Sequence, residues 1–176
     1  MGTCFQQRQF PCGELYIAAD EHAVRAVAFT SNWARINAAS VRRRRTATPD
    51  RPAAAQLQEY FAGQRRVFDL PLQMDGTLFQ RRAWQALQDI PYGETRSYAE
   101  QAALLGQPQA VRAVGHANGL NPLSIVVPCH RVIAKSGKLA GYAGGLACKQ
   151  FLLALESGEK ACHEALPQGG GLWQSC

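Results

Sequence analysis

The first 72 residues carry a hydrophobic and polar pattern that predicts a hairpin, a helix and a further strand. In residues 13–30, GELYIAADEHAVRAVAFT, apolar and polar side chains alternate on both sides of a polar Asp-Glu-His stretch, which is typical of a β-hairpin. Residues 52–63 place their larger apolar side chains on one helical face and end at Gly63. Residues 66–72 are expected to form a strand at a sheet edge, because they include a proline. No group in this part of the chain is a candidate for catalysis.

The pattern changes after residue 73, where three short helices are predicted. Two of them begin with a capping box, in which a Ser or Thr and a Gln or Glu three residues later bind each other's backbone N–H groups. These pairs are Thr77 with Gln80 and Ser97 with Glu100. The third helix is expected to begin at Pro108 and to end at Gly119. The last two helices, with the turn between them, have the dimensions of a helix-turn-helix.

The helix predicted at 108–119 has an unusual surface. Its small residues fall on one stripe, and its only formally charged side chain is Arg112. The stripe consists of Ala110, Ala113 and Ala117, with Gly115 close by. A helix that reads base edges in the major groove normally carries several Arg, Asn or Gln side chains. Either this helix packs into a core with an exposed arginine, or it approaches a surface closely and inserts that arginine.

These patterns predict an α/β fold in the N-terminal domain, residues 1–72, with a small antiparallel sheet and a helix. A mainly helical C-terminal domain with a winged helix-turn-helix is expected at 73–160, and a loose tail at 161–176. The apolar runs are too short to span a bilayer and the polar start is no signal peptide, so we expect a cytoplasmic protein with no membrane partner.

The net charge of +6 permits a polyanionic partner but does not require one. The only dense basic cluster, Arg42–Arg45, is expected to be a solvated loop. The six cysteines have no CxxC spacing, so reduced thiols are expected and not a disulfide framework. Cys4, Cys12 and His22 are too loosely spaced to favour a zinc site, and we expect no metal.

One cysteine lies in a setting that suggests chemistry. Residues 124–127, SIVV, predict a buried strand that Pro128 ends just before Cys129 and His130. Neighbouring side chains of a strand face opposite sides, so a turn after the proline is needed to bring thiol and imidazole together. A basic neighbour raises the thiolate fraction of a cysteine, and an acid normally orients the imidazole. Glu156 is the best-placed acid in the later sequence.

The segment PCHRV, residues 128–132, resembles the O6-alkylguanine-DNA alkyltransferase family (methylated-DNA–protein-cysteine methyltransferases) of the bacterial type. It is preceded by NGLNPLSIVV and followed by GYAGG at 141–145, and the resemblance is continuous over residues 76–157. The first 70 residues fit the variable N-terminal domain of that family only in size and expected elements. Members of the family are single-use repair proteins, which implies direct transfer of an alkyl group from guanine O6 in DNA to this protein.

The resemblance implies a role for each residue around the cysteine. Cys129 would be the nucleophile that takes the alkyl group, and His130 would be its base, acting through water. Glu156 would orient the imidazole. Tyr98 matches the tyrosine whose hydroxyl assists the leaving base, and Asn121 matches the asparagine that braces the turn between the DNA-reading helix and the active-site strand.

The resemblance also implies how DNA is bound. The nucleotide is rotated out of the duplex, and Arg112, on a helix lying in the minor groove, would fill the vacated place. Further residues implied at the DNA are Tyr98, Ala110, Ala113, Gly115, Lys135 and Gln80. Those implied around the flipped base are Val132, Tyr142, Ala143 and Gly144. Ala143 stands where some relatives have serine, and His116 stands where Gly or Ala was expected.

The implied partner is double-stranded DNA containing O6-alkylguanine, bound by a monomer, with cooperative binding along DNA left open. No cofactor is implied, because the thioether product needs no regeneration. One rival hypothesis is a Cys-His-Glu hydrolase that turns over through an acyl-enzyme. Another is a lesion-recognising or regulatory helix-turn-helix protein that binds DNA without transfer. The adducts accepted and the role of the N-terminal domain are left open.

Overall fold

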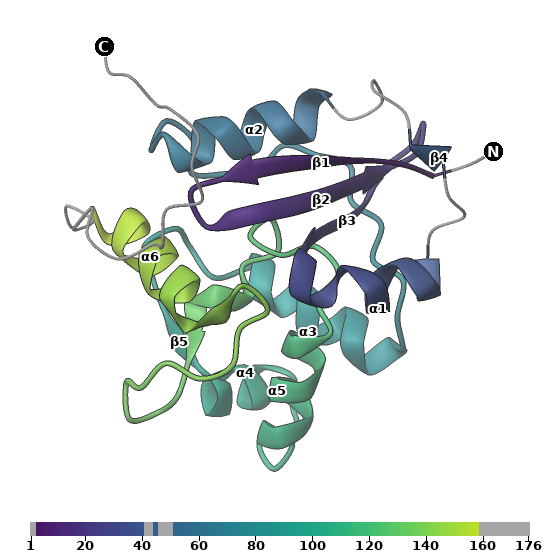
Figure 1. Ribbon diagram of the computed structural model, residues 1–176. Helices are drawn as coiled ribbons and strands as arrows, with labels where there is room; N and C mark the ends of the chain where they lie inside the picture. Colours follow the sequence, from purple (N-terminus) through teal and green to yellow (C-terminus); the bar gives the residue numbers. More distant parts are fainter. Residues whose placement is uncertain (1–2, 41–43, 46–50, 159–176) are drawn as a thin grey trace.

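The computed structural model describes residues 3–40, 44–45 and 51–158. Its N-terminal part is built on a four-stranded sheet with the strand order β3-β2-β1-β4 (Figure 1). The strands are β1 (Cys4–Phe10), β2 (Gly13–Ala19), β3 (Val24–Phe29) and β4 (Arg44–Arg45). The predicted hairpin is confirmed as the antiparallel pair β2–β3, whereas β1, which pairs with β2 along its full length, was not predicted.

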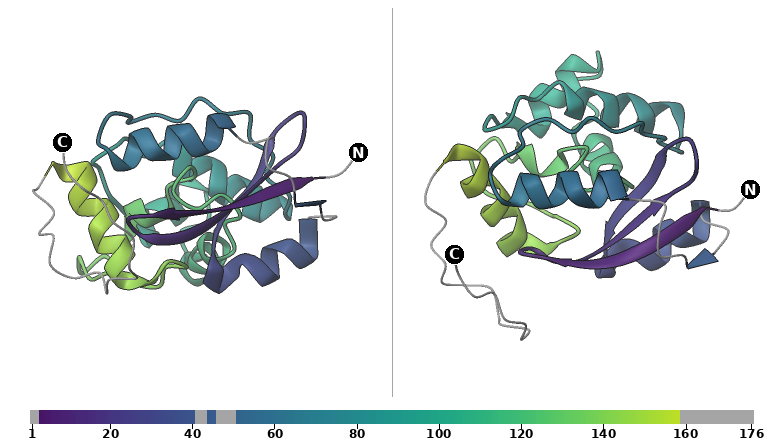
Figure 2. Two further views of the ribbon diagram at one scale, coloured as in Figure 1. Left: turned by 45° about the horizontal axis from the view of Figure 1, so that its top comes forward. Right: turned by 90° about the horizontal axis from the view of Figure 1, so that it is seen from above.

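Helices cover both faces of this sheet, as Figures 1 and 2 show. On one face, α1 (Thr30–Ser40) packs Trp33 and Ile36 against small strand residues such as Ala26. This helix was not predicted. On the other face, α2 (Arg51–Phe61) is the helix predicted at 52–63, and it packs Leu57 and Tyr60 into the main core. That core continues into the C-terminal part, so the two halves share one apolar interior.

The C-terminal part consists of helices around a two-stranded parallel ladder, β5 (Arg96–Ser97) with β6 (Val132–Ile133). The helices are α3 (Leu78–Gln88), α4 (Tyr98–Leu104), α5 (Val111–Gly119) and α6 (Gly145–Ser157), together with the 3-10 helix η1 (Cys129–Arg131). Both predicted capping boxes form at α3 and α4. The indole of Trp84 on α3 donates to the Ala117 carbonyl of α5 over 2.8 Å, which fixes α5 against α3.

Helix α5 differs from its prediction in two respects. It begins at Val111 and not at Pro108, because residues 107–110 form a turn in which the Ala110 N–H donates to the Gln107 carbonyl. Ala117 does not continue the outward stripe, since it is buried at 2% exposure in the cluster between α3, α4 and α5.

The strand predicted at 66–72 is wrong. The segment begins with a bend at residues 66–67 and makes only an isolated bridge from Leu72 to Val24 at the edge of β3. The Val24 N–H donates to the Pro71 carbonyl, and the Gln73 N–H donates back to Val24. Pro71 itself has no N–H with which to extend a ladder, so the pairing stops there.

The strand predicted at 124–127 is also wrong, because this apolar run is a buried turn. Ile125 has a φ of +72°, and the Val127 N–H closes the turn on the Leu123 carbonyl over 2.8 Å. Short apolar runs fit several buried conformations, so their periodicity alone does not identify a strand. The turn is held by β3, whose Val27 exchanges backbone hydrogen bonds with Pro122 and Ser124.

The run Arg42–Arg45 was expected to be a loop, but the backbone of Arg44–Arg45 forms β4, parallel to the start of β1. Arg42 and Arg43 and the tail predicted at 161–176 lie outside the described residues. No helix in the described ranges is long and apolar enough to cross a membrane.

Candidate active site around Cys129

Cys129 lies at the start of η1, directly after the buried turn, and Asn121 holds the two together. The Asn121 amide nitrogen donates to the Val127 carbonyl over 2.8 Å and lies 3.3 Å from the Cys129 sulfur. Its oxygen accepts the Leu123 N–H at 3.0 Å. One buried side chain therefore holds both ends of the turn and touches the thiol.

The thiol opens into a cavity of about 560 Å³, a volume typical of ligand pockets. The cavity lies between α4, α5 and the loop before α6, with α1 at its rim. Seven of the residues expected at the site line it: Tyr98, Arg112, Gly115, Asn121, Cys129, Tyr142 and Ala143. The structure thus brings Arg112 of α5 and Cys129 to one opening.

Burial and the polar groups around Cys129 act in opposite directions on the acidity of its thiol. Burial raises the pKa of the thiol, while the Asn121 hydrogen bond and the positive charge of Lys149 lower it in part. Lys149 was not predicted as a site residue. Its ammonium donates to the carbonyls of Val132 and Ala140, at 2.6 and 2.9 Å, and lies 5.8 Å from the centre of the Tyr98 ring.

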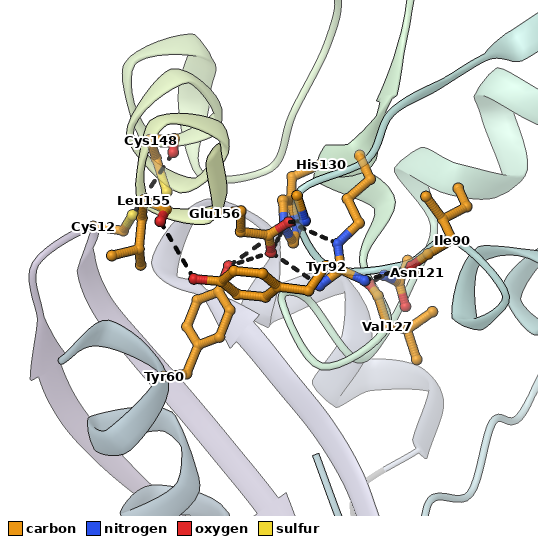
Figure 3. A network of polar contacts seen from close by, with 12 residues as sticks. Cys12, Tyr60, Ile90, Tyr92, Asn121, Val127, His130, Cys148, Leu155 and Glu156 are labelled. Atoms are coloured by element: carbon orange, nitrogen blue, oxygen red, sulfur yellow. Dashed lines mark hydrogen bonds and ion pairs between the residues drawn. The ribbon is translucent and has the colours of Figure 1, made fainter. Parts of the chain in front are cut away.

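His130 does not point into the cavity but lies behind the thiol, fully buried, in a polar network (Figure 3). Its Nε2 lies 2.8 Å from Oε1 of Glu156, the acid that the sequence suggested. Because a carboxylate only accepts, Nε2 carries the hydrogen and Nδ1 keeps its lone pair. Nδ1 is buried and has no hydrogen-bond partner among the described residues. It is therefore the free basic atom of the site.

Glu156 is surrounded by donors. The Arg131 guanidinium, whose side chain is 8% exposed, binds both carboxylate oxygens at 2.8 and 3.0 Å, and the Gly93 N–H lies 3.2 Å from Oε2. Burial raises the pKa of Glu156, but the hydrogen bonds and charges of His130 and Arg131 outweigh it and lower the pKa to about 2. Burial lowers the pKa of His130, and Glu156 opposes that effect. The carboxylate is thus ionised and the imidazole is available as a neutral base.

Tyr98 lines the same cavity as the thiol. Burial, and to a lesser extent the nearby Cys129, raises the pKa of Tyr98, so its hydroxyl stays protonated and can donate a hydrogen bond. Tyr142 is more deeply buried, and its ring packs edge-on against Phe29 and His130. The cavity therefore has an aromatic wall and a hydroxyl donor close to the thiol.

Several expected site residues lie outside this cavity. The Val132 carbonyl faces Lys149, and Gly144 packs so closely on Phe29 that a Cβ there would lie 2.6 Å from the ring. Gln80 serves the capping box of α3. The remaining ones are at the surface: Ala113 and His116 are exposed on α5, Ala110 precedes it, and Lys135 lines a second cavity of about 480 Å³ with Arg96.

The other buried thiols form a pair away from the cavity opening. Cys12, in the β1–β2 turn, lies 3.8 Å from the carbonyl of Cys148 on α6, and both are free. Among the residues that the structure describes, no three His, Cys, Asp or Glu side chains are grouped as a metal site would require.

Two family models match the chain in succession. Residues 6–74 match the ribonuclease-like domain of 6-O-methylguanine DNA methyltransferase, and residues 78–158 match its DNA-binding domain. The structure therefore has the two-domain architecture of that family.

Individual relatives agree with these models. A methylated-DNA–protein-cysteine methyltransferase of Mycolicibacterium paratuberculosis is 64% identical over 59% of this chain and 63% of its own length. One from Methanosarcina acetivorans is 46% identical over 83% of this chain and 93% of its own. The structure of Mycobacterium tuberculosis OGT in complex with DNA superposes with a TM-score of 0.79 at 44% identity, covering 89% of this chain and 94% of that one.

Proposed function

Since the chain belongs to the 6-O-methylguanine DNA methyltransferase family, we propose that it repairs DNA by direct reversal, transferring the alkyl group of O6-alkylguanine to Cys129. The observation that carries this proposal is the position of the thiol. Cys129 opens into a base-sized cavity that Arg112 of α5 also lines. A nucleophile and a candidate wedge for the DNA stack therefore share one opening.

The transfer is a single displacement at carbon. The Cys129 sulfur forms a bond to the alkyl carbon while the bond from that carbon to O6 breaks, and the electron pair stays on the guanine oxygen. The thiol proton goes to His130 Nδ1 through a water molecule, and the departing guanine anion takes up one proton from solvent water. Tyr98 lines the cavity, and its protonated hydroxyl donates a hydrogen bond to the leaving base. Because the product is a thioether, each molecule reacts once.

We assign DNA binding to the helix-turn-helix formed by α4 and α5, with the loop after β6 as its wing. Gly115 and the exposed Ala113 have no bulky side chains, so this side of α5 can approach the minor groove closely. Arg112, also exposed, fills the place of the flipped nucleotide. Lys135 and Arg96, which line the second cavity, are placed to contact DNA phosphates. We propose that the protein binds DNA as a monomer.

The test is peptide mass spectrometry after incubation with a duplex carrying one O6-methylguanine. We expect one added methylene mass on the tryptic peptide 113–131, which holds Cys129, saturating at one per protein. The Cys129→Ser variant and an unmodified duplex are the controls, and the peptide with Cys148 should stay unchanged. Binding without an adduct would favour the lesion-recognising hypothesis, and repeated turnover on an ester or amide would favour the hydrolase.

A further inference from the structure

Tyr60, in α2 of the N-terminal domain, reaches the carboxylate behind the reactive cysteine. Its side chain is fully buried, and its hydroxyl donates to Glu156 Oε1 over 2.6 Å (Figure 3). The same hydroxyl lies 3.5 Å from His130 Nε2. Ninety-six positions separate Tyr60 from Glu156 in the chain, so the fold alone brings them together.

Three donors therefore converge on one carboxylate oxygen. Glu156 Oε1 accepts from Tyr60 Oη at 2.6 Å, from His130 Nε2 at 2.8 Å and from Arg131 Nη2 at 3.0 Å. Donors that share one oxygen each reduce the negative charge that the others experience. The hydrogen bond from Tyr60 thus weakens the hydrogen bond between Glu156 and the Nε2–H of His130. It also fixes the position of Oε1, the oxygen that selects the Nε2–H tautomer.

We propose that Tyr60 is a positioning residue for alkyl transfer, whose hydroxyl holds the Glu156 carboxylate and thereby sets the basicity of His130. It touches neither the substrate nor the thiol, and it acts through Glu156. This inference rests on the proposed function, and it gives the N-terminal domain a part in the chemistry. It corrects the expectation that this domain contributes no group to the site.

The direction of the effect follows from the groups that face His130. These are Cys129 and Arg131 in η1, Glu156 and Lys149 in α6, Tyr60 in α2, and Tyr142 in the loop before α6. Among them only Glu156 favours the imidazolium by charge, and Arg131 and Lys149 oppose it. Removing the Tyr60 hydroxyl leaves more charge on Oε1 for His130, so the pKa of His130 should rise.

The experiment compares wild type with Tyr60→Phe, which keeps the ring and removes only the hydroxyl. The pKa of His130 is measured in the free protein by NMR of its imidazole nitrogens, and single-turnover transfer is measured from pH 5 to pH 9. Because only neutral His130 accepts the thiol proton, the rate falls as the pH drops below its pKa. The midpoint of the NMR titration and the midpoint of the pH–rate profile should both move to higher pH in the variant, by about 0.5–1 pH unit.

A matched control and a second variant separate positioning from folding. Tyr92→Phe removes a hydroxyl from the ring that packs edge-on against Tyr60, but that hydroxyl donates to the Leu155 carbonyl, so the midpoints should not move. Replacing Tyr60 with 3-fluorotyrosine gives a stronger donor and should shift both midpoints down. A lower melting temperature with unchanged midpoints would overturn the proposal. The NMR titration needs no substrate, so failure of alkyl transfer itself would be recognised separately.

Discussion

Glu156→Gln tests whether the buried carboxylate is ionised and paired in the way that the structure indicates. The pKa of Glu156 is lowered from an ordinary value of 4.5 to about 2. At about 1.4 kcal/mol per pH unit, this shift corresponds to roughly 3 kcal/mol of folding stability at pH 7. The side chain of Glu156 is 1% exposed, so solvent screening reduces this figure little. The substitution keeps the volume but leaves Arg131 buried without its counter-charge, which costs about 3–5 kcal/mol.

The sign of the pH dependence can be stated in advance. A carboxyl with a depressed pKa stabilises the folded state above its unfolded pKa, and that stability is lost as the pH falls toward 2. The difference in unfolding free energy between wild type and variant should therefore narrow by about 2 kcal/mol between pH 5 and pH 3. Urea unfolding followed by tryptophan fluorescence measures it. Glu59→Gln, at a partly exposed pair with Arg65, should cost less than about 1 kcal/mol at both pH values. If the difference in unfolding free energy between wild type and Glu156→Gln stays constant from pH 5 to pH 3, the reasoning is refuted.

Three further predictions concern the cavity and its surroundings. Arg112→Ala should slow repair in duplex DNA far more than reaction with free O6-methylguanine, and equal losses would contradict its role in flipping. Lys149→Met removes a charge that lowers the pKa of Cys129, so the midpoint of iodoacetamide alkylation should move to higher pH, while Lys138→Met should leave it unchanged. Gly144→Ala would place a Cβ 2.6 Å from the Phe29 ring and should cost about 1–3 kcal/mol of stability in thermal melts, whereas Gly141→Ala has open space.

The elements that could be predicted from sequence are those whose signals lie within a few residues. Thr77 with Gln80 and Ser97 with Glu100 satisfy each other's helix ends locally, and both helices begin where those pairs indicate. The pairing of His130 with Glu156 was also anticipated, because a thiol and imidazole in sequence call for a third group. The two capping pairs need no knowledge of the tertiary fold, whereas His130 and Glu156 are 26 positions apart and were paired by their chemistry alone.

The features that could not be predicted depend on contacts between distant segments. SIVV became a turn because Asn121 and Val27 supply the hydrogen bonds that a strand partner would otherwise provide. Lys149 looks like a surface residue in the sequence, yet it is fully buried, and its ammonium donates hydrogen bonds to the carbonyls of Val132 in β6 and Ala140 in the loop before α6. A tyrosine on an apolar helix face predicts burial, but nothing local indicates which acid its hydroxyl will meet.

The N-terminal domain contributes contacts to the site around Cys129, although nothing in its sequence predicts them. Phe29 supports the loop at Gly144 and packs edge-on against Tyr142, while Ser31 at the start of α1 donates to the Ala143 carbonyl. Tyr60 completes the donors on the carboxylate behind the thiol. Since these contacts reach both the wall of the cavity and the acid that orients His130, a change in the N-terminal core can alter the chemistry without touching DNA. The two halves therefore build the site together, although their sequences carry separate signals.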